Sequence, residues 1–92
     1  MTTQDISFII PVYNRQDELE ELLGSFLDLE GNSDFEIVVI EDGSQISSSA
    51  IIDKFINNLD ISYFYKANSG PGDSRNFGMD NAKGKYFIIL DS

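Results

Sequence analysis

The chain has 92 residues, of which 41% are hydrophobic and 12% aromatic, and this composition supports one small domain with a packed core rather than global disorder. Sixteen acidic residues against six basic ones give a net charge of −10, which opposes binding to nucleic acid or to an anionic membrane, since both require clustered Lys and Arg. Cys and His are absent, so disulfides, thiolate metal sites and histidine-ligated zinc are excluded.

The sequence shows no targeting or membrane segment. No apolar run approaches the roughly 20 residues of a membrane-spanning helix, and the N-terminus lacks the basic and apolar regions of a signal peptide. We therefore expect a cytoplasmic protein, which is peripheral to the inner membrane only if regions outside these residues attach it there.

The first half of the chain predicts two strands around one helix. Residues 6–12 and 35–40 are short apolar runs rich in β-branched residues, typical of strands that are covered on both faces. Between them the apolar residues recur with helical spacing, at Leu19, Leu22, Leu23, Phe26 and Leu27. Asn14 or Asp17 is expected to cap the start of this helix, and residues 31–33 to end it.

The second half continues the alternation. A helix is expected to begin within residues 47–49, with a core face made of Ala50, Ile51, Phe55 and Leu59. Residues 61–65 alternate and are aromatic, which fits an edge strand. Residues 68–72 predict a loop, residues 74–82 a short helix with Gly84 as its C-cap, and residues 86–90 a buried strand. The order β-α-β-α-β-α-β predicts a mostly parallel four-stranded sheet with helices on both faces, a three-layer α/β domain.

Three common families with such a sheet do not fit. A dinucleotide-binding domain requires a glycine-rich turn after the first strand, and residues 12–15 contain no glycine. A P-loop would need a glycine-rich segment ending in Lys and Ser or Thr, and none is present. A phospho-acceptor receiver domain carries paired acids after its first strand, whereas this chain carries Glu41 and Asp42 after its second.

Seven short segments carry a more specific pattern, in this order: Ile-Ile-Pro-Val-Tyr-Asn at 9–14, Phe-Glu-Ile-Val-Val at 35–39, Asp-Gly-Ser at 42–44, Asn-Ser-Gly-Pro at 68–71, Ser-Arg-Asn-Phe-Gly at 74–78, Ala-Lys-Gly-Lys-Tyr at 82–86 and Leu-Asp-Ser at 90–92. Together they resemble the N-terminal, nucleotide-binding half of a family 2 glycosyltransferase with the GT-A fold. The resemblance implies a Rossmann-like sheet of order 3-2-1-4, truncated at residue 92 before the acceptor-binding half.

The resemblance also implies a donor-nucleotide site. Asp42 would accept a hydrogen bond from the base, and Gly43 would let the ligand approach the backbone; the alternative is a simple Asp-Gly turn. Pro11, Val12 and Tyr13 would form the wall of the base pocket, unless they serve only as a strand end and as packing. Arg75 would lie near the nucleotide, where its planar charged group suits a base edge or a phosphate; a solvent-facing Arg is the alternative.

The last residues resemble the start of the family's D-x-D metal motif. Asp91 would hold Mg²⁺ or Mn²⁺ against the donor diphosphate, because hard cations prefer oxygen ligands. The second acid of the motif would follow Ser92, so the motif is incomplete in residues 1–92. Glu41 stands where the family usually has Asp, and Ile46 where a further acid often follows.

The expected function is that of a glycosyltransferase in polysaccharide biosynthesis. A nucleotide-diphosphate sugar, with a UDP-sugar favoured, would donate to an unknown saccharide or lipid-linked acceptor with inversion. The family's general base comes from the second half, so we expect no catalytic residue in residues 1–92 and no turnover by this part alone. The alternative is a non-catalytic α/β interaction or scaffold domain. Because the last strand is interior in the family, an exposed edge here predicts homo-oligomers.

Overall fold

A computed structural model describes residues 6–27 and 35–90 of the protein. Its elements follow the predicted alternation, as β1 (Ile6–Val12), α1 (Gln16–Leu27), β2 (Glu36–Asp42), α2 (Ser49–Phe55), β3 (Ile61–Lys66), α3 (Pro71–Asn81) and β4 (Tyr86–Ile89). In this described part of the chain, no helix combines the length and apolarity needed to cross a membrane.

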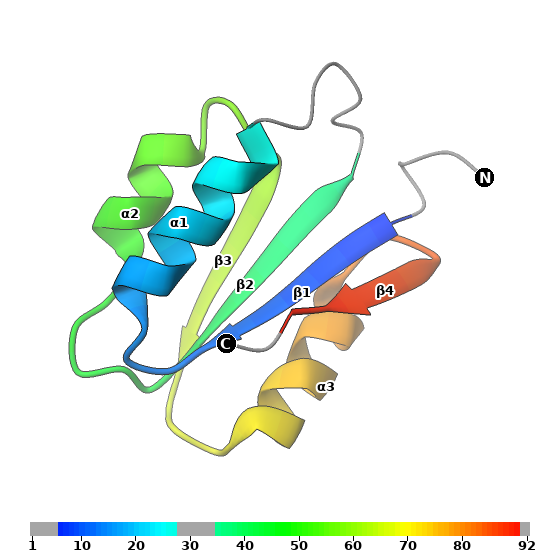
Figure 1. The fold of residues 1–92 in the computed structure, drawn as a ribbon. Helices are drawn as coiled ribbons and strands as arrows, with labels where there is room; N and C mark the ends of the chain where they lie inside the picture. The colour runs from blue at the N-terminus through cyan, green and yellow to red at the C-terminus, as the bar shows by residue number, and fades with distance from the viewer. Residues whose placement is uncertain (1–5, 28–34, 91–92) are drawn as a thin grey trace.

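The four strands form one parallel sheet in the order β3-β2-β1-β4. Helices α1 and α2 lie side by side on one face, and α3 covers the other (Figure 1). The predicted three-layer architecture, the parallel pairing and the edge position of the third strand are therefore confirmed. Strand β2 is interior, and all seven of its residues are buried.

Alternation along the strands divides the core between the two faces of the sheet. On one face, every second residue of the strands packs against α1 and α2. The larger core cluster lies there and contains Ile10, Val12, Leu19, Leu23, Phe26, Phe35, Ile37, Val39, Ile52, Phe55, Leu59 and Ile61. On the face covered by α3, the alternate strand residues form a smaller cluster of Ile9, Val38 and Ile40, packed with Phe64, Phe77, Met79 and Ala82. Because β1 and β2 contribute to both clusters, their sequences are almost continuously apolar, as predicted.

Helix α1 starts differently from the prediction. The amide of Leu19 donates to the carbonyl of Arg15 at 3.0 Å, so Arg15 occupies the capping position. Asn14 has a positive φ of 54°, and its side chain accepts from the amide of Gln45 at 3.0 Å instead. Asp17 lies within the first helical turn. The predicted end of the helix at 31–33 lies outside the described residues.

Helices α2 and α3 correct two further predictions. In α2 Phe55 is buried and Ile51 packs against the larger core cluster, so the predicted core face is confirmed at these two positions. It is wrong at Ala50, which is exposed, and it omits Ile52, which is buried. Leu59 is buried, but it follows the end of the helix.

Helix α3 begins at Pro71 rather than at Ser74. Proline suits a first helical position since its missing N–H has no helical partner there. Gly70 precedes it with a φ of 99°. The helix ends at Asn81, followed by Ala82 in an extended conformation, so Gly84 is not the C-cap.

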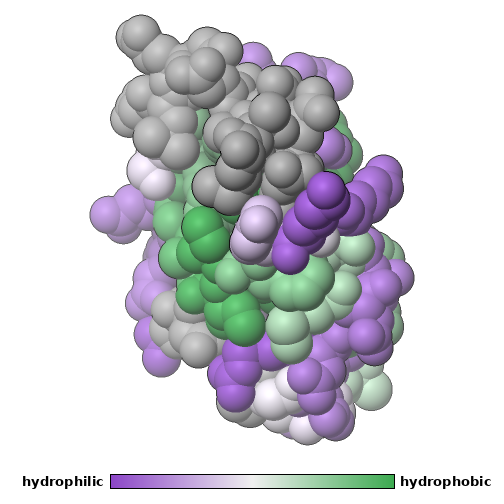
Figure 2. Space-filling view, turned by 90° about the vertical axis from the view of Figure 1, so that its right-hand side faces the viewer, coloured by the Kyte–Doolittle hydropathy of each residue, from purple (hydrophilic) through white to green (hydrophobic). Residues whose placement is uncertain are grey.

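Strand β4 is not buried, contrary to the prediction. It pairs with β1 at the edge of the sheet, and Tyr86, Phe87, Ile88 and Ile89 are 37–54% exposed. A hydrophobic region is visible on this side of the molecule (Figure 2). The apolar residues of β4 pair with β1, but no other element within residues 6–27 and 35–90 buries their side chains. The predicted self-association through this edge stays a prediction.

Helix α3 approaches the sheet closely at Gly78. A Cβ atom at this position would lie 2.5 Å from Cγ2 of Ile9 and 2.7 Å from Cδ1 of Ile40, well inside van der Waals contact. Gly78 therefore sets the distance between α3 and the second core cluster.

We predict that Gly78→Ala lowers the free energy of unfolding by about 1–3 kcal/mol, the usual cost of overpacking a core. Gly24 in α1 is the matched control, because a Cβ there would meet nothing within 4 Å. Gly24→Ala should leave stability unchanged or raise it by about 0.5–1 kcal/mol through helix propensity. Urea denaturation of both variants measures the difference, and equal effects would contradict the close-approach interpretation.

Candidate functional site

The candidate site lies at the carboxyl ends of β1, β2 and β3. In the parallel register Val12 is level with Glu41, and Asp42 is level with Lys66. The loops that follow these residues therefore emerge together at one edge of the sheet. In open parallel sheets this edge is where ligands bind.

Asp42 is buried, with 4% of its surface exposed. Its Oδ1 atom accepts from Nζ of Lys66 at 2.7 Å and from the amide of Ser69 at 2.8 Å. Its Oδ2 atom accepts from the amide of Gly70 at 3.0 Å. Asp42 thus ties the end of β2 to the loop that leads into α3.

These contacts favour the ionised form of Asp42. Burial alone raises the pKa of a carboxyl group, but the hydrogen bonds from Lys66, Ser69 and Gly70, together with the charge of Lys66, outweigh it. The pKa of Asp42 consequently lies below its ordinary value of 3.8. Asp42 is a carboxylate at neutral pH, which makes it a hydrogen-bond acceptor.

Gly43 uses its conformational freedom for the protein's own loop. Its φ is +70°, and a Cβ there would lie 2.7 Å from the backbone nitrogen of Asn68. Nδ2 of Asn68 donates to the carbonyl of Asp42 at 3.0 Å. A glycine is thus required at this position for the two loops to pack, whether or not a ligand also approaches the backbone.

Glu41 is a second buried carboxylate, with 0% exposure. It accepts a short hydrogen bond from the hydroxyl of Ser44, one from the amide of Ser48 at 2.9 Å and one from the hydroxyl of Tyr63 at 2.9 Å. Because successive strand residues face opposite sides of the sheet, Glu41 organises the loop toward α2 and Asp42 the loop toward α3.

The pKa of the Tyr63 phenol is shifted by its own burial and in part by the buried carboxylate of Glu41. Burial raises the pKa of its phenol above 10.0, and the hydrogen bond to Glu41 and the charge of Glu41 raise it further, against the lowering effect of the bonds from Ser47 and Ser48. The neutral phenol is therefore the form that the fold stabilises, and it donates to Glu41.

Ser44 links the loop after β1 to the loop after β2. Its hydroxyl oxygen accepts from the amide of Asn14 at 2.8 Å, and its carbonyl accepts from the hydroxyl of Tyr65 at 2.7 Å. Gln16 adds a short bond to the carbonyl of Ile46. The loops after all three strands are thus fixed to one another through polar groups.

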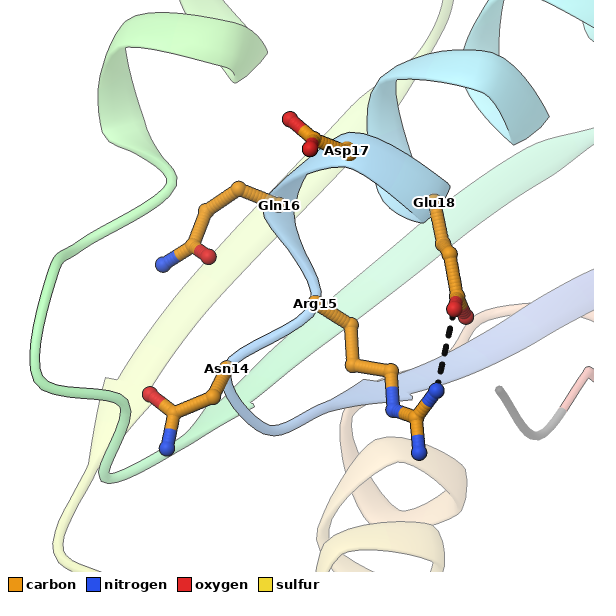
Figure 3. Close-up of a pocket in the computed structure, with 5 residues that line it drawn as sticks. All are labelled: Asn14, Arg15, Gln16, Asp17 and Glu18. Carbon is orange, nitrogen blue, oxygen red and sulfur yellow. Dashed lines mark hydrogen bonds and ion pairs between the residues drawn. The ribbon is translucent and has the colours of Figure 1, made fainter.

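A shallow pocket of about 240 Å³ opens where β1 meets α1, lined by Asn14, Arg15, Gln16, Asp17 and Glu18. Asn14 and Gln16 point toward the loop between β2 and α2, whereas Arg15 and Glu18 point together on the other side (Figure 3). The Arg15–Glu18 ion pair spans 2.9 Å and both side chains are about half exposed, so it contributes little stability.

The structure places the other predicted site residues in two groups. Pro11 and Val12 are buried at the end of β1, and Tyr13 follows them with 52% of its surface exposed. Arg75 lies half-buried in the second turn of α3. Asp91, the predicted metal ligand, and Ser92 lie outside the described residues.

The described residues do not supply a metal site by themselves. No group of three or more acidic side chains converges within residues 6–27 and 35–90. The buried carboxylates Glu41 and Asp42 are engaged by hydroxyl, amide and ammonium donors. The residues present therefore do not form the oxygen-rich shell that Mg²⁺ or Mn²⁺ requires.

The sequence does not predict the roles of two residues of the site. It shows Glu41 next to Asp42 after the second strand and departing mildly from the family pattern, but it predicts no contact for Glu41 and does not single out Lys66. The signal for Lys66 was available, because it is one of six basic residues and ends the strand that neighbours β2. The signal for Glu41 was its position inside an apolar strand, where a charge requires partners.

Comparison with known proteins decides the family. The model of glycosyl transferase family 2 matches residues 7–92. The chain belongs to glycosyl transferase family 2. The resemblance recognised from the sequence is thereby confirmed, as is the GT-A-like fold.

The relatives are longer than this chain. An uncharacterized glycosyltransferase of Rickettsia conorii is 44% identical over 95% of the chain, which spans 14% of that relative. Poly(ribitol-phosphate) β-N-acetylglucosaminyltransferase TarS of Staphylococcus aureus is 34% identical over 94% of the chain, which spans 16% of that relative.

Solved structures agree. The structure of S. aureus TarS 1–349 in complex with UDP superimposes with a TM-score of 0.84 at 30% identity, and covers 100% of this chain and 27% of that one. A mannosyltransferase of Pyrobaculum calidifontis, in complex with GDP-Man and Mn²⁺, superimposes with a TM-score of 0.80 at 20% identity. The matched region is 95% of this chain and 27% of that structure. At 20% identity, this similarity shows a shared fold and no more.

Removing the charge of Glu41 should disconnect the loops. In Glu41→Gln an amide NH₂ would face donors from Ser44, Ser48 and Tyr63, and unsatisfied buried donors are costly. We expect a loss of about 2–4 kcal/mol in the free energy of unfolding and a lowered pKa of Tyr63. Urea denaturation and ultraviolet titration of the phenol measure these effects. Glu21→Gln, at an exposed position of α1, is the control; equal stability of both variants would contradict the role of Glu41.

Asp42→Asn should destabilise the protein in a pH-dependent way. Since the pKa of Asp42 is lowered on folding, its stabilisation is complete above the ordinary value of 3.8 and is lost as the pH falls through the folded value. We expect the wild type to exceed Asp42→Asn by roughly 2–4 kcal/mol at neutral pH, with the gap narrowing in acid. Urea denaturation of both proteins across this range measures it. Asp53→Asn, at an exposed position of α2, should show almost no gap; a gap for Asp42→Asn that is constant with pH would refute the assignment.

Proposed function

We propose that the described residues form the donor-nucleotide half of a glycosyltransferase that uses a UDP-sugar. The observation that carries this proposal is the match along the whole chain to TarS 1–349 in complex with UDP, at 30% identity. An ionised acceptor, Asp42, also lies at the sheet edge where such folds bind nucleotides.

In this proposal each candidate residue has a role consistent with its place. Asp42 accepts a hydrogen bond from the base, and Tyr13, which follows the end of β1 and is about half exposed, covers the base with its ring. Pro11 and Val12 support that wall from within the sheet. Gly43 keeps the loop close to Asn68.

Residues of α3 and of the end of the chain would bind the phosphate groups of the donor. Arg75 in α3 would face the nucleotide with its guanidinium group. Asp91 would contribute one carboxylate to Mg²⁺ or Mn²⁺, which as a Lewis acid stabilises the leaving diphosphate. Since residues 6–27 and 35–90 supply no metal site, we assign no reaction step to the ion within this part of the chain.

The reaction proposed for the whole protein is an inverting transfer to a saccharide or lipid-linked acceptor in polysaccharide biosynthesis. The residues described here bind and orient the donor, and none of them is assigned as the general base. The chain spans 12–31% of the length of five curated relatives. We therefore propose that residues 1–92 alone bind the donor weakly and do not turn it over.

A binding or scaffold domain is the second candidate. It is favoured by one observation, that both Glu41 and Asp42 are already engaged by the protein's own donors. A domain that uses its acids only for loop packing would keep the fold and bind no nucleotide.

Titration with UDP in the presence of Mn²⁺ distinguishes the two candidates. We expect amide chemical-shift changes at Tyr13, Asp42 and Arg75, and an affinity at least tenfold lower in Asp42→Asn, because a charge-assisted hydrogen bond to the base is lost. Asp53→Asn is the matched control and should bind as the wild type does. Absence of any shift at these residues would support the scaffold domain and overturn the donor site.

A further inference from the structure

The Asp42 carboxylate is almost fully occupied before any ligand arrives. An ionised carboxylate offers about four acceptor positions, two on each oxygen. Oδ1 accepts from Lys66 and Ser69, at 2.7 and 2.8 Å, which fills both of its positions. Oδ2 accepts from Gly70 at 3.0 Å, which leaves one position.

Lys66 is held firmly in this arrangement. Its side chain is only 17% exposed, and its ammonium group also donates to the carbonyl of Ala67 at 3.3 Å and, in a short bond, to the hydroxyl of Ser69. All three ammonium hydrogens therefore have acceptors. A ligand would have to break several bonds to displace Lys66 from Oδ1, so the occupied state of Oδ1 persists on binding.

We propose that Lys66 is a specificity-determining residue, because by filling Oδ1 of Asp42 it limits the site to a nucleobase edge with a single N–H. This inference rests on the proposed function of the same site. Uracil presents one ring N–H between two carbonyl groups and fits a single acceptor position. Guanine presents two adjacent N–H groups, and a bidentate contact needs a free acceptor position on each oxygen.

The low exposure of Asp42 further disfavours a base that presents two N–H groups. With Asp42 only 4% exposed, little of the residue is accessible to a base, and a second N–H of the base would be desolvated without an acceptor. An unpaired buried donor weakens binding, by roughly tenfold or more. Discrimination follows from the acceptor count rather than from the size of the base.

Comparing inosine diphosphate with guanosine diphosphate tests the acceptor count directly. The two purines differ only in the 2-amino group, so base size and phosphates are held constant. In the wild-type protein, calorimetric titration should give an affinity for inosine diphosphate roughly tenfold or more above that for guanosine diphosphate. Equal affinities for the two, or tighter binding of guanosine diphosphate, would overturn the proposal without any substitution being made.

Two variants test the role of Lys66. Lys66→Met keeps the length of the side chain and removes its charge, which frees a position on Oδ1 and lets both N–H groups of guanine find acceptors. The ratio of the two affinities should then fall to within about threefold of one. Lys66→Arg retains a donor to Oδ1 and should keep the wild-type preference.

Lys54→Met is the matched control, since it removes the same charge from the exposed ion pair between Lys54 and Glu20, whose atoms lie 2.7 Å apart. It should leave the ratio unchanged. A ratio that is the same in Lys66→Met as in the wild type overturns the role of Lys66, while UDP binding in all variants leaves the proposed function standing. Failure of UDP, inosine diphosphate and guanosine diphosphate alike to bind the wild type would overturn the proposed function and this inference together.

Discussion

The arrangement of the site depends on two adjacent carboxylates at the end of an interior strand. Glu41 and Asp42 follow an apolar run in β2 and are both buried, so each must find donors within the protein. Because consecutive residues of a strand face opposite sides of the sheet, the two acids cannot share partners. Glu41 therefore binds the loop after β2 and Asp42 the loop after β3, while the loop after β1 is held through the bond from Asn14 to Ser44.

The consequence differs for the two acids. Glu41 accepts from hydroxyl and amide donors of the loop before α2 and of β3, which makes it a structural centre with no exposed surface. Asp42 accepts from an ammonium group and from two amides in the loop before α3. It retains acceptor capacity at the edge where a ligand is expected. Two neighbouring residues thus differ in that Glu41 serves packing alone, whereas Asp42 has the recognition role that we propose.

The elements that sequence predicted well are those with a strong repeating pattern. Strands β1 and β2 are covered on both faces, so their continuous apolar character indicated them clearly. Helix α1 buries Leu19, Leu23 and Phe26, three of the five positions expected from its spacing. The sequence predicts the start of α3 too late, because Gly70-Pro71 is typical of a loop, whereas Pro71 begins the helix. The apolar sequence of β4 predicted burial, but its edge position leaves it exposed.

The sequence by itself determined the order of the elements, the family and the position of Asp42 at a strand end, because hydrophobic periodicity and short local motifs are properties of neighbouring residues. The contacts of Asp42 with Lys66, 24 residues away, and of Ser44 with Asn14, 30 residues away, were decided only by the tertiary structure. Strand register sets which distant side chains stand level with one another, and no local pattern encodes that register. The number of acceptor positions that Asp42 retains is therefore a property of the folded sheet.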